Sequence, residues 1–150
     1  MSDVSATPLT NIYYLRSCDP DDDETWPGGG FFTNNYVDYQ NDVDHRVQVT
    51  AYGQSFIGAN HPALSLCSKD CRAKAFIYTW WPISSTVDLS QVWAGTVPTA
   101  SGNFYYDVGT NHSGDIGIGI VFNIGTINAG DSAAISYAYG FNNFGGIIAV

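Results

Sequence analysis

Basic residues are scarce in this chain, which has five lysines and arginines against fourteen acidic residues and a formal net charge of −9. Proteins that bind nucleic acid use Lys and Arg to neutralise phosphates, and five such residues are too few to form a basic stripe. An anionic membrane surface is disfavoured for the same reason. No run of 18 apolar residues occurs, so we expect no membrane-spanning helix. Nucleic acid and a membrane span are therefore excluded from the expected partners and features.

Good helix formers are also scarce, since the chain has a single Met and Glu24 is its only glutamate. Aromatic residues make up 15% of the sequence, which is unlike a disordered chain. Gly, Asn and Asp recur about every 8–12 residues, the spacing of turns in a sandwich or barrel. We therefore expect one all-β domain over residues 1–150, an antiparallel β-sandwich of about seven to nine strands.

Alternating or β-branched and aromatic segments indicate where the strands lie. They predict strands over 11–16, 31–39, 45–52, 73–81, 86–93, 103–108, 115–125 and 132–139. Residues 1–10 are expected to form an extended N-terminal segment, and the apolar residues 145–150 a C-terminal strand. The segment 53–70 is expected to be irregular, with a short helical turn near Ala63 and Leu64.

The segment 115–125 has the clearest alternation in the chain. Isoleucines and a phenylalanine occupy one face, and Gly117 and Gly119 occupy the other, so we expect bulky aromatic rings to lie over these glycines. A turn over 126–131 then leads into the alternating segment 132–139. Together the two segments are expected to form a hairpin.

The sequence of this expected hairpin resembles that of a known family. The run Ile-Gly-Thr-Ile at 124–127, followed by Ala-Gly-Asp-Ser at 129–132 and an alternating strand, resembles the closing hairpin of immunoglobulin and fibronectin-III-like modules of secreted surface proteins. The resemblance implies an immunoglobulin-like sandwich. It also implies a module that serves as a spacer, an adhesive unit or a building block of extracellular fibres.

The three cysteines, Cys18, Cys67 and Cys71, are an odd number. Cys67 and Cys71 can close a small loop, or Cys18 can bond to one of them and leave the other free or linked to a neighbouring chain. All three can also remain reduced. The triplet Asn111-His112-Ser113 is a glycosylation sequon, expected on a surface loop. With the low lysine content and high acidity, these features favour an extracellular or cell-surface protein.

The loop after Cys18 is strongly acidic, and Asp19, Asp21, Asp22 and Asp23 are candidate calcium ligands. Ca²⁺ takes six to eight oxygen ligands, which closely spaced carboxylates in a loop can supply. The pattern of an EF-hand is missing, so a solvated acidic turn is the alternative. A second acidic set, Asp38, Asp42 and Asp44, follows in the sequence.

Three of the five basic residues, Lys69, Arg72 and Lys74, lie close together in the sequence. An acidic pole and a basic pole on one molecule favour head-to-tail association, and heterologous contacts that do not close produce filaments. In the alternative interpretation, the acidic and basic loops are neighbours within the domain and pair with each other.

Several aromatic residues are candidates for a partner interface or for stacking on sugar rings. Adjacent residues on a strand point to opposite faces, so one of Trp80 and Trp81, and one of Tyr105 and Tyr106, should face solvent or a partner. Trp93 is a further candidate. A partner interface is the favoured role for the outward-facing member of each pair.

Motifs for catalysis are weak. The chain has three histidines, His45, His61 and His112, and no Gly-x-Ser-x-Gly nucleophile elbow. We therefore expect a non-enzymatic, extracellular structural module that packs with copies of itself or with sister domains. The alternatives are a calcium-assisted carbohydrate-binding module and a fragment of a secreted hydrolase.

Overall fold

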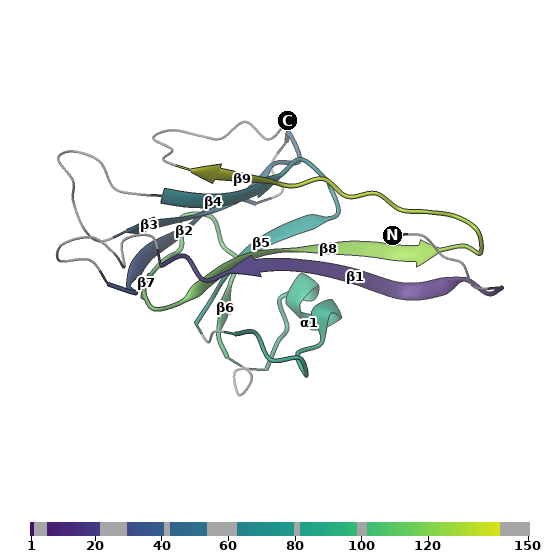
Figure 1. Cartoon of the computed structure of the whole chain (residues 1–150), viewed down its shortest axis with the longest axis horizontal. Helices are drawn as coiled ribbons and strands as arrows, with labels where there is room; N and C mark the ends of the chain where they lie inside the picture. Colours follow the sequence, from purple (N-terminus) through teal and green to yellow (C-terminus); the bar gives the residue numbers. More distant parts are fainter. Residues whose placement is uncertain are drawn as a thin grey trace.

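The computed structural model describes residues 1, 6–21, 30–40, 43–53, 63–79, 82–98 and 102–141. These residues form two antiparallel sheets packed face to face (Figure 1). The strands are β1 (Leu9–Cys18), β2 (Thr33–Gln40), β3 (Val47–Gly53), β4 (Ala63–Ser68), β5 (Ala73–Tyr78), β6 (Phe104–Tyr105), β7 (Asn111–Gly114), β8 (Gly117–Ile127) and β9 (Ala138–Phe141).

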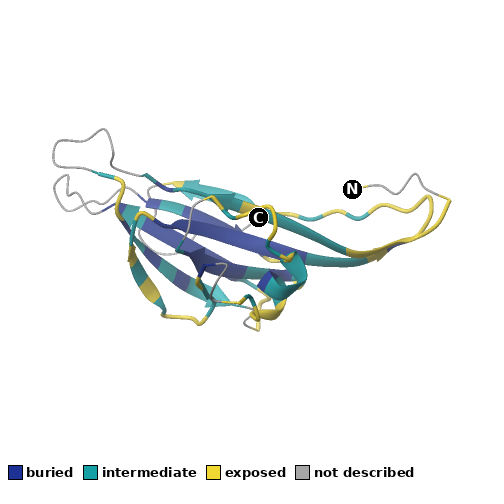
Figure 2. Ribbon diagram, turned by 90° about the horizontal axis from the view of Figure 1, so that it is seen from below, coloured by how far each residue is buried: buried dark blue, intermediate teal, exposed yellow. Residues whose placement is uncertain are grey.

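The first sheet has four strands in the order β1-β8-β5-β6, and the second has five in the order β7-β2-β3-β4-β9. This arrangement confirms the expected all-β antiparallel sandwich, and its nine strands are within the expected number. At one end, β1 and β8 extend as a two-stranded ribbon beyond the other strands, and Figure 2 shows that exposed residues concentrate there. The expected C-terminal strand, 145–150, lies outside the described residues.

The main core lies between the two sheets. It is formed by alternate residues of the strands that face each other, and its fully buried side chains include Val37, Val49, Leu66, Ile77, Ile118, Ile120 and Phe122. The predicted isoleucine face of residues 115–125 is thus confirmed as a core face. Alternation explains it, because a strand with one face against the partner sheet buries every second residue.

A smaller outer core lies on the other face of the four-stranded sheet. The segment that contains helix α1 (Leu89–Ala94) covers this face and contributes Val92 to the outer core. The other buried residues of the outer core lie on β5 and β8: Phe76, Tyr78 and Val121. Gly119 faces Phe76 across the β5–β8 pair, and a Cβ atom at Gly119 would collide with the Phe76 ring. The prediction that aromatic rings lie over the glycine face is therefore confirmed for this pair.

The expected strand over 86–93 is wrong, because much of it forms α1. The side chain of Asp88 accepts a hydrogen bond from the Ser90 backbone N–H and caps the first turn, and Gly95 ends the helix at a φ of +76°. The expected helical turn at Ala63 and Leu64 is also wrong. These residues begin β4, which pairs with β3 and β9.

The expected hairpin between 115–125 and 132–139 is wrong as well. A turn does occur at the predicted place, where the Asp131 N–H donates to the Asn128 carbonyl. However, β8 is already paired with β1 and β5 on its two sides, so the returning chain has no edge of β8 to join. It crosses instead to the second sheet, where β9 pairs with β4.

Among the described residues, no helix has the length and apolar character needed to cross a bilayer.

The close approach of Phe76 to Gly119 can be tested by adding one methyl group. We expect Gly119→Ala to lower the free energy of unfolding by about 1–3 kcal/mol, since the ring is confined within the outer core and cannot move freely. Urea denaturation measures the change. The matched control is Gly30→Ala, because Gly30 has open space around its Cβ position. Equal stability of the two variants would show that the ring adjusts without cost.

Candidate functional site

An acidic cluster lies at one end of the four-stranded sheet, just after β1. One carboxylate oxygen each of Asp19, Asp21 and Asp115 lies within 4.8 Å of the others. Asp19 and Asp21 belong to the predicted calcium set, whereas Asp22 and Asp23 lie outside the described residues. Asp115 was not predicted, because it reaches the cluster from the segment before β8, almost one hundred positions away in the sequence.

The electrostatics of the cluster make it a candidate for a cation. Burial, together with the charges of Asp21 and Asp115, raises the pKa of Asp19 to about 6. The Oδ1 atom of Asp19 is buried and accepts no hydrogen bond. Asp19 and Asp21 are partly buried and Asp115 is exposed, and their three carboxylates are the described groups that could hold a calcium ion.

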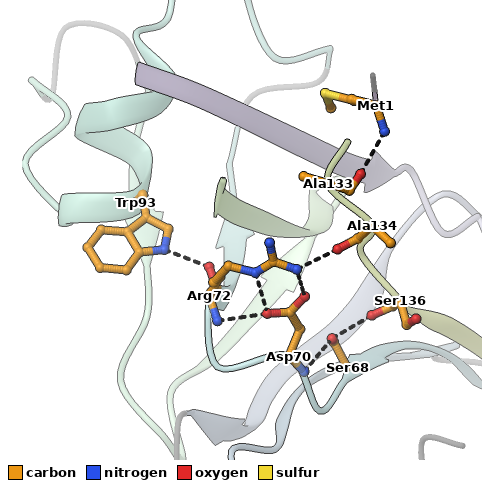
Figure 3. A network of polar contacts seen from close by, with 8 residues as sticks. All are labelled: Met1, Ser68, Asp70, Arg72, Trp93, Ala133, Ala134 and Ser136. Atoms are coloured by element: carbon orange, nitrogen blue, oxygen red, sulfur yellow. Dashed lines mark hydrogen bonds and ion pairs between the residues drawn. The ribbon is translucent and has the colours of Figure 1, made fainter. Parts of the chain in front are cut away.

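The predicted basic set is largely engaged within the protein. Arg72 donates to Asp70 through Nε at 2.9 Å and through Nη2 at 2.6 Å, and Nη2 also donates to the Ala134 carbonyl at 2.5 Å (Figure 3). These contacts lower the pKa of Asp70. Lys69 remains exposed.

Lys74 and Trp93 lie next to this turn. Trp93 donates its indole N–H to the Arg72 carbonyl at 2.9 Å, and the Lys74 ammonium lies 5.4 Å from the centre of the Trp93 ring. Burial lowers the pKa of Lys74. Trp93 is thus partly buried and links α1 to the β4–β5 turn. Its ring is therefore not fully exposed to a partner.

The described parts of the acidic and basic regions lie toward opposite ends of the four-stranded sheet. Strand register places Cys18 beside Ile118 and Ile77 at one end of the four-stranded sheet. Arg72 precedes the opposite end of β5. The described acidic and basic residues are therefore separated along the strands, but residues 22–24 of the acidic loop lie outside the described residues, so the interpretation in which the two loops pair stays a prediction. The basic end is nevertheless weakened by the pairing of Arg72 with Asp70.

Of the alternatives for the three cysteines, the structure has all three as thiols, without a disulfide between Cys67 and Cys71. Cys67 is buried on β4, where its thiol contacts the Ala138 carbonyl of β9, while Cys71 is exposed in the turn. Burial raises the pKa of Cys67. Cys18, at the far end of the sheet, is not positioned to pair with either of them.

The predictions for the paired aromatic residues are confirmed only in part. Tyr105 and Tyr106 pack on opposite sides, as expected for neighbours on a strand, but both are partly buried and neither is freely exposed. The Tyr105 ring stacks on His112 with 3.5 Å between ring centres. The hydroxyl of Tyr106 is buried without a hydrogen-bond partner, and burial raises its pKa. Trp80 and Trp81 lie outside the described residues.

Asn111 is exposed, as a glycosylation site requires. It lies at the start of β7, an edge strand, and not on the loop that the sequence suggested. Its partner across the β2–β7 pair is Tyr36.

The free edge of β1 is a feature that sequence analysis did not identify. Strand β1 pairs with β8 on one side, and among the described residues no strand pairs with its other side. A groove of about 400 Å³ runs beside this edge. It is lined by β1 residues, including Tyr13, Leu15 and Ser17, and by the segment 82–89, including Ile83 and Val87.

A second pocket, of about 360 Å³, lies over the five-stranded sheet, away from β1. Its described lining comes from β2 and β3: Asn34, Tyr36, Asp38, Tyr52 and Gly53. Only Asp38 had been noted in the sequence, as part of an acidic set.

A scan against protein-family models, a search of curated proteins and a search of solved structures each found no match to this chain. Arguments about its function therefore rest on its own side chains, edges and pockets.

The Asp70–Arg72 pair gives a prediction for stability. We expect Arg72→Gln to lower the free energy of unfolding by about 1–2 kcal/mol at pH 7, because both the ion pair and the contact with Ala134 are lost. Asp70 has a lowered pKa in the folded state, so this contribution is present at neutral pH and fades as the pH falls through the ordinary range of aspartate. Urea denaturation at pH 7 and pH 3 measures both effects.

Lys69→Gln removes the same charge from the same turn and serves as the control. If both variants lose the same stability at pH 7, the pair has no special role.

The acidic cluster gives a pH-dependent prediction of opposite sign. The pKa of Asp19 is raised in the folded state, so folding favours the protonated form and stability declines as the pH rises from about 4 through about 6. Asp19→Asn removes this penalty and should raise the thermal midpoint at pH 7.5 while leaving it unchanged at pH 4. Thermal denaturation followed by circular dichroism measures the shift.

Asp107→Asn, at an exposed position, is the control for loss of charge. If the cluster binds calcium, excess calcium chloride raises the midpoint of the wild type at pH 7.5 and that of Asp107→Asn, but not that of Asp19→Asn. An equal response of all three proteins would contradict a calcium site at this cluster.

Proposed function

We propose that this chain is a non-catalytic, extracellular structural module that associates with copies of itself through the free edge of β1. The pair of copies formed through β1 is in turn a unit of a fibre, sheath or surface layer, whose growth needs a further contact between pairs. The observation that carries the proposal is the length and regularity of an edge strand whose outer side has no described pairing strand.

Edge strands expose backbone N–H and C=O groups that can pair with another chain, and proteins usually protect them. The other three edges of this sandwich are short, since β6 has two residues and β7 and β9 have four each. Strand β1 has ten residues. It has register shifts only between Leu9 and Tyr13, and its pairing with β8 is continuous from Tyr13 to Cys18.

The usual protections are absent from this regular part of β1. It contains no Pro and no Lys, and its one charged residue, Arg16, is hydrogen-bonded to the Tyr139 hydroxyl of β9. Arg16 is therefore turned toward the second sheet. It does not project from the edge, where it would repel an approaching strand.

The groove beside β1 supplies the second requirement for strand addition. In this mode of binding, backbone hydrogen bonds give affinity and pockets for alternate side chains give specificity. Apolar side chains such as Leu15 and Val87 line the groove, so an added strand can bury apolar side chains there. A second copy that contributes its own β1 in antiparallel orientation would join two four-stranded sheets into one.

A second candidate function, calcium-assisted carbohydrate binding, is favoured by one observation. The carboxylates of Asp19, Asp21 and Asp115 converge at one end of the sandwich. The calcium titration described above tests this alternative without reference to β1.

The association through β1 can be tested with a charge placed on the edge strand. Ser17 lines the groove and faces Gly119 of β8. We expect Ser17→Lys to weaken self-association by about tenfold or more, because a buried ammonium group at the joint costs free energy and two copies repel each other. Sedimentation velocity over a range of concentrations, with reductant present, measures the equilibrium.

Thr96→Lys adds the same charge at an exposed position away from β1 and is the matched control. The proposal requires wild type and Thr96→Lys to sediment above the 16.2 kDa of one chain and Ser17→Lys to shift toward it. A wild type that remains monomeric at every concentration, or a Ser17→Lys variant that behaves as Thr96→Lys, would overturn it.

A further inference from the structure

The pocket over the five-stranded sheet is built on the face that points away from the main core. Val37 and Val49 face the main core, so their neighbours along β2 and β3 point outward. Asn34, Tyr36 and Asp38 thus follow one another on the outer side of β2, and Tyr52 lies directly opposite Asn34 on β3. The pocket of about 360 Å³ is a usual size for a small-molecule site.

Asp38 is placed in this pocket by an irregularity in the sheet. The pairing of β2 with β3 passes from Val37–Val49 directly to Tyr39–Gln48, so Asp38 is the extra residue of a β-bulge. Bulges re-aim a side chain, and they are over-represented near binding and active sites.

A chain of hydroxyl and amide groups holds the Asp38 carboxylate. Its Oδ2 atom accepts hydrogen bonds from the Thr50 hydroxyl and from Gln48 Nε2, the latter at 3.3 Å. Thr50 is in turn 2.8 Å from the Ser65 hydroxyl of β4. Gln48, Thr50 and Ser65 are almost fully buried, so the support is rigid and extends over three strands.

The same network leaves acceptors unused. The described donors all reach Oδ2, so Oδ1 of Asp38 receives no hydrogen bond from a described residue. The Oε1 atom of Gln48, which is 4% exposed, is buried without a hydrogen-bond partner. Burial raises the pKa of Asp38 in spite of its two donors, because the charged carboxylate is partly removed from water. A ligand that carries hydroxyl groups would donate hydrogen bonds to Oδ1.

Two tyrosines form the apolar part of the pocket. The ring centres of Tyr36 and Tyr52 are 5.6 Å apart, and their planes meet at 80°. One ring can therefore lie under a flat ligand while the other closes its side. Burial and the nearby Asp38 charge raise the pKa of Tyr52, so its hydroxyl remains a hydrogen-bond donor at neutral pH.

These groups restrict the class of ligand. No described lining residue is basic, and the chain carries a net charge of −9, which disfavours phosphates and acidic sugars. A purely apolar ligand would displace water from Oδ1 of the half-buried Asp38 carboxylate and offer no hydrogen bond in return, at a cost in free energy. A pyranose ring combines an apolar face of C–H groups with neighbouring hydroxyls that donate to a carboxylate.

We propose that Tyr36, Tyr52, Asp38 and Asn34 form a binding site for a neutral sugar residue of a glycan. One tyrosine ring stacks on the apolar face of the sugar, and the carboxylate of Asp38 and the amide of Asn34 bind its hydroxyls. The site is independent of the β1 edge, which belongs to the other sheet, so either proposal can fail without the other. It also differs from the aromatic residues that the sequence had suggested for sugar stacking.

The test is saturation-transfer-difference NMR of the full chain with a panel of neutral methyl glycosides and their short oligosaccharides, followed by calorimetric titration of those that bind. We expect at least one neutral sugar to bind, with affinity around the millimolar range for a single residue. Asp38→Asn should weaken binding about tenfold, because a charged acceptor is lost without a change of shape. Tyr52→Phe should have a smaller effect, and Tyr36→Ala should abolish binding.

Asp107→Asn alters the same residue type as Asp38→Asn outside the pocket and should bind as the wild type does. The thermal midpoint of each variant shows whether it is folded. If Tyr36→Ala does not fold, Asp38→Asn still tests the proposal. Tetramethylammonium chloride is included because a carboxylate beside two aromatic rings could instead hold a methylated cation. Binding of that cation without any sugar, binding of no sugar in the panel, or unchanged binding by Asp38→Asn would each overturn the proposal.

Discussion

The ion pair of Asp70 and Arg72 is the point where the separate parts of this sandwich are joined. It lies in the turn between β4 and β5, where the chain passes from one sheet to the other. Its guanidinium group binds the carbonyl of Ala134 in the crossover to β9, and the Arg72 carbonyl accepts the indole N–H of Trp93 from α1. Nearby, Ser68 donates to the Ser136 carbonyl at 2.6 Å (Figure 3). The turn between β4 and β5 therefore holds the outer core and the crossover to β9 in place relative to the main core.

The sequence was most informative where side chains alternate, and least informative about which strands are neighbours. The isoleucine and glycine faces of 115–125 could be assigned correctly, since alternation depends only on local spacing. The partner of that strand could not, because pairing depends on which edges are already occupied. The strand expected over 86–93 failed for a different reason: β-branched residues there suggested extended chain, while the capping residues Asp88 and Gly95 were the stronger signal.

The candidate sites could be predicted only in part for the same reason, because the fold brings together residues that are distant in the sequence. Asp19 and Asp21 could be identified because acidic residues cluster in the sequence, but Asp115 joins them only through the fold. The pocket of Tyr36, Asp38 and Tyr52 depends on a register between β2 and β3 and on a bulge, neither of which is visible in composition. A signal was nevertheless present: Asn34, Tyr36 and Asp38 alternate with Asn35 and Val37, which gives one strand a polar and aromatic outer face.

The position of β8 has a consequence for the order in which the molecule assembles. Its partner β1 begins near the start of the chain, and the pairing of Leu9 with Ile127 joins two of the most distant described segments. During synthesis, β1 leaves the ribosome long before β8 exists, so for that interval both of its edges are bare. Contacts between such distant segments slow folding, and unpaired strands are prone to premature association. Until β8 has been made, nascent copies with this topology are exposed to association through β1.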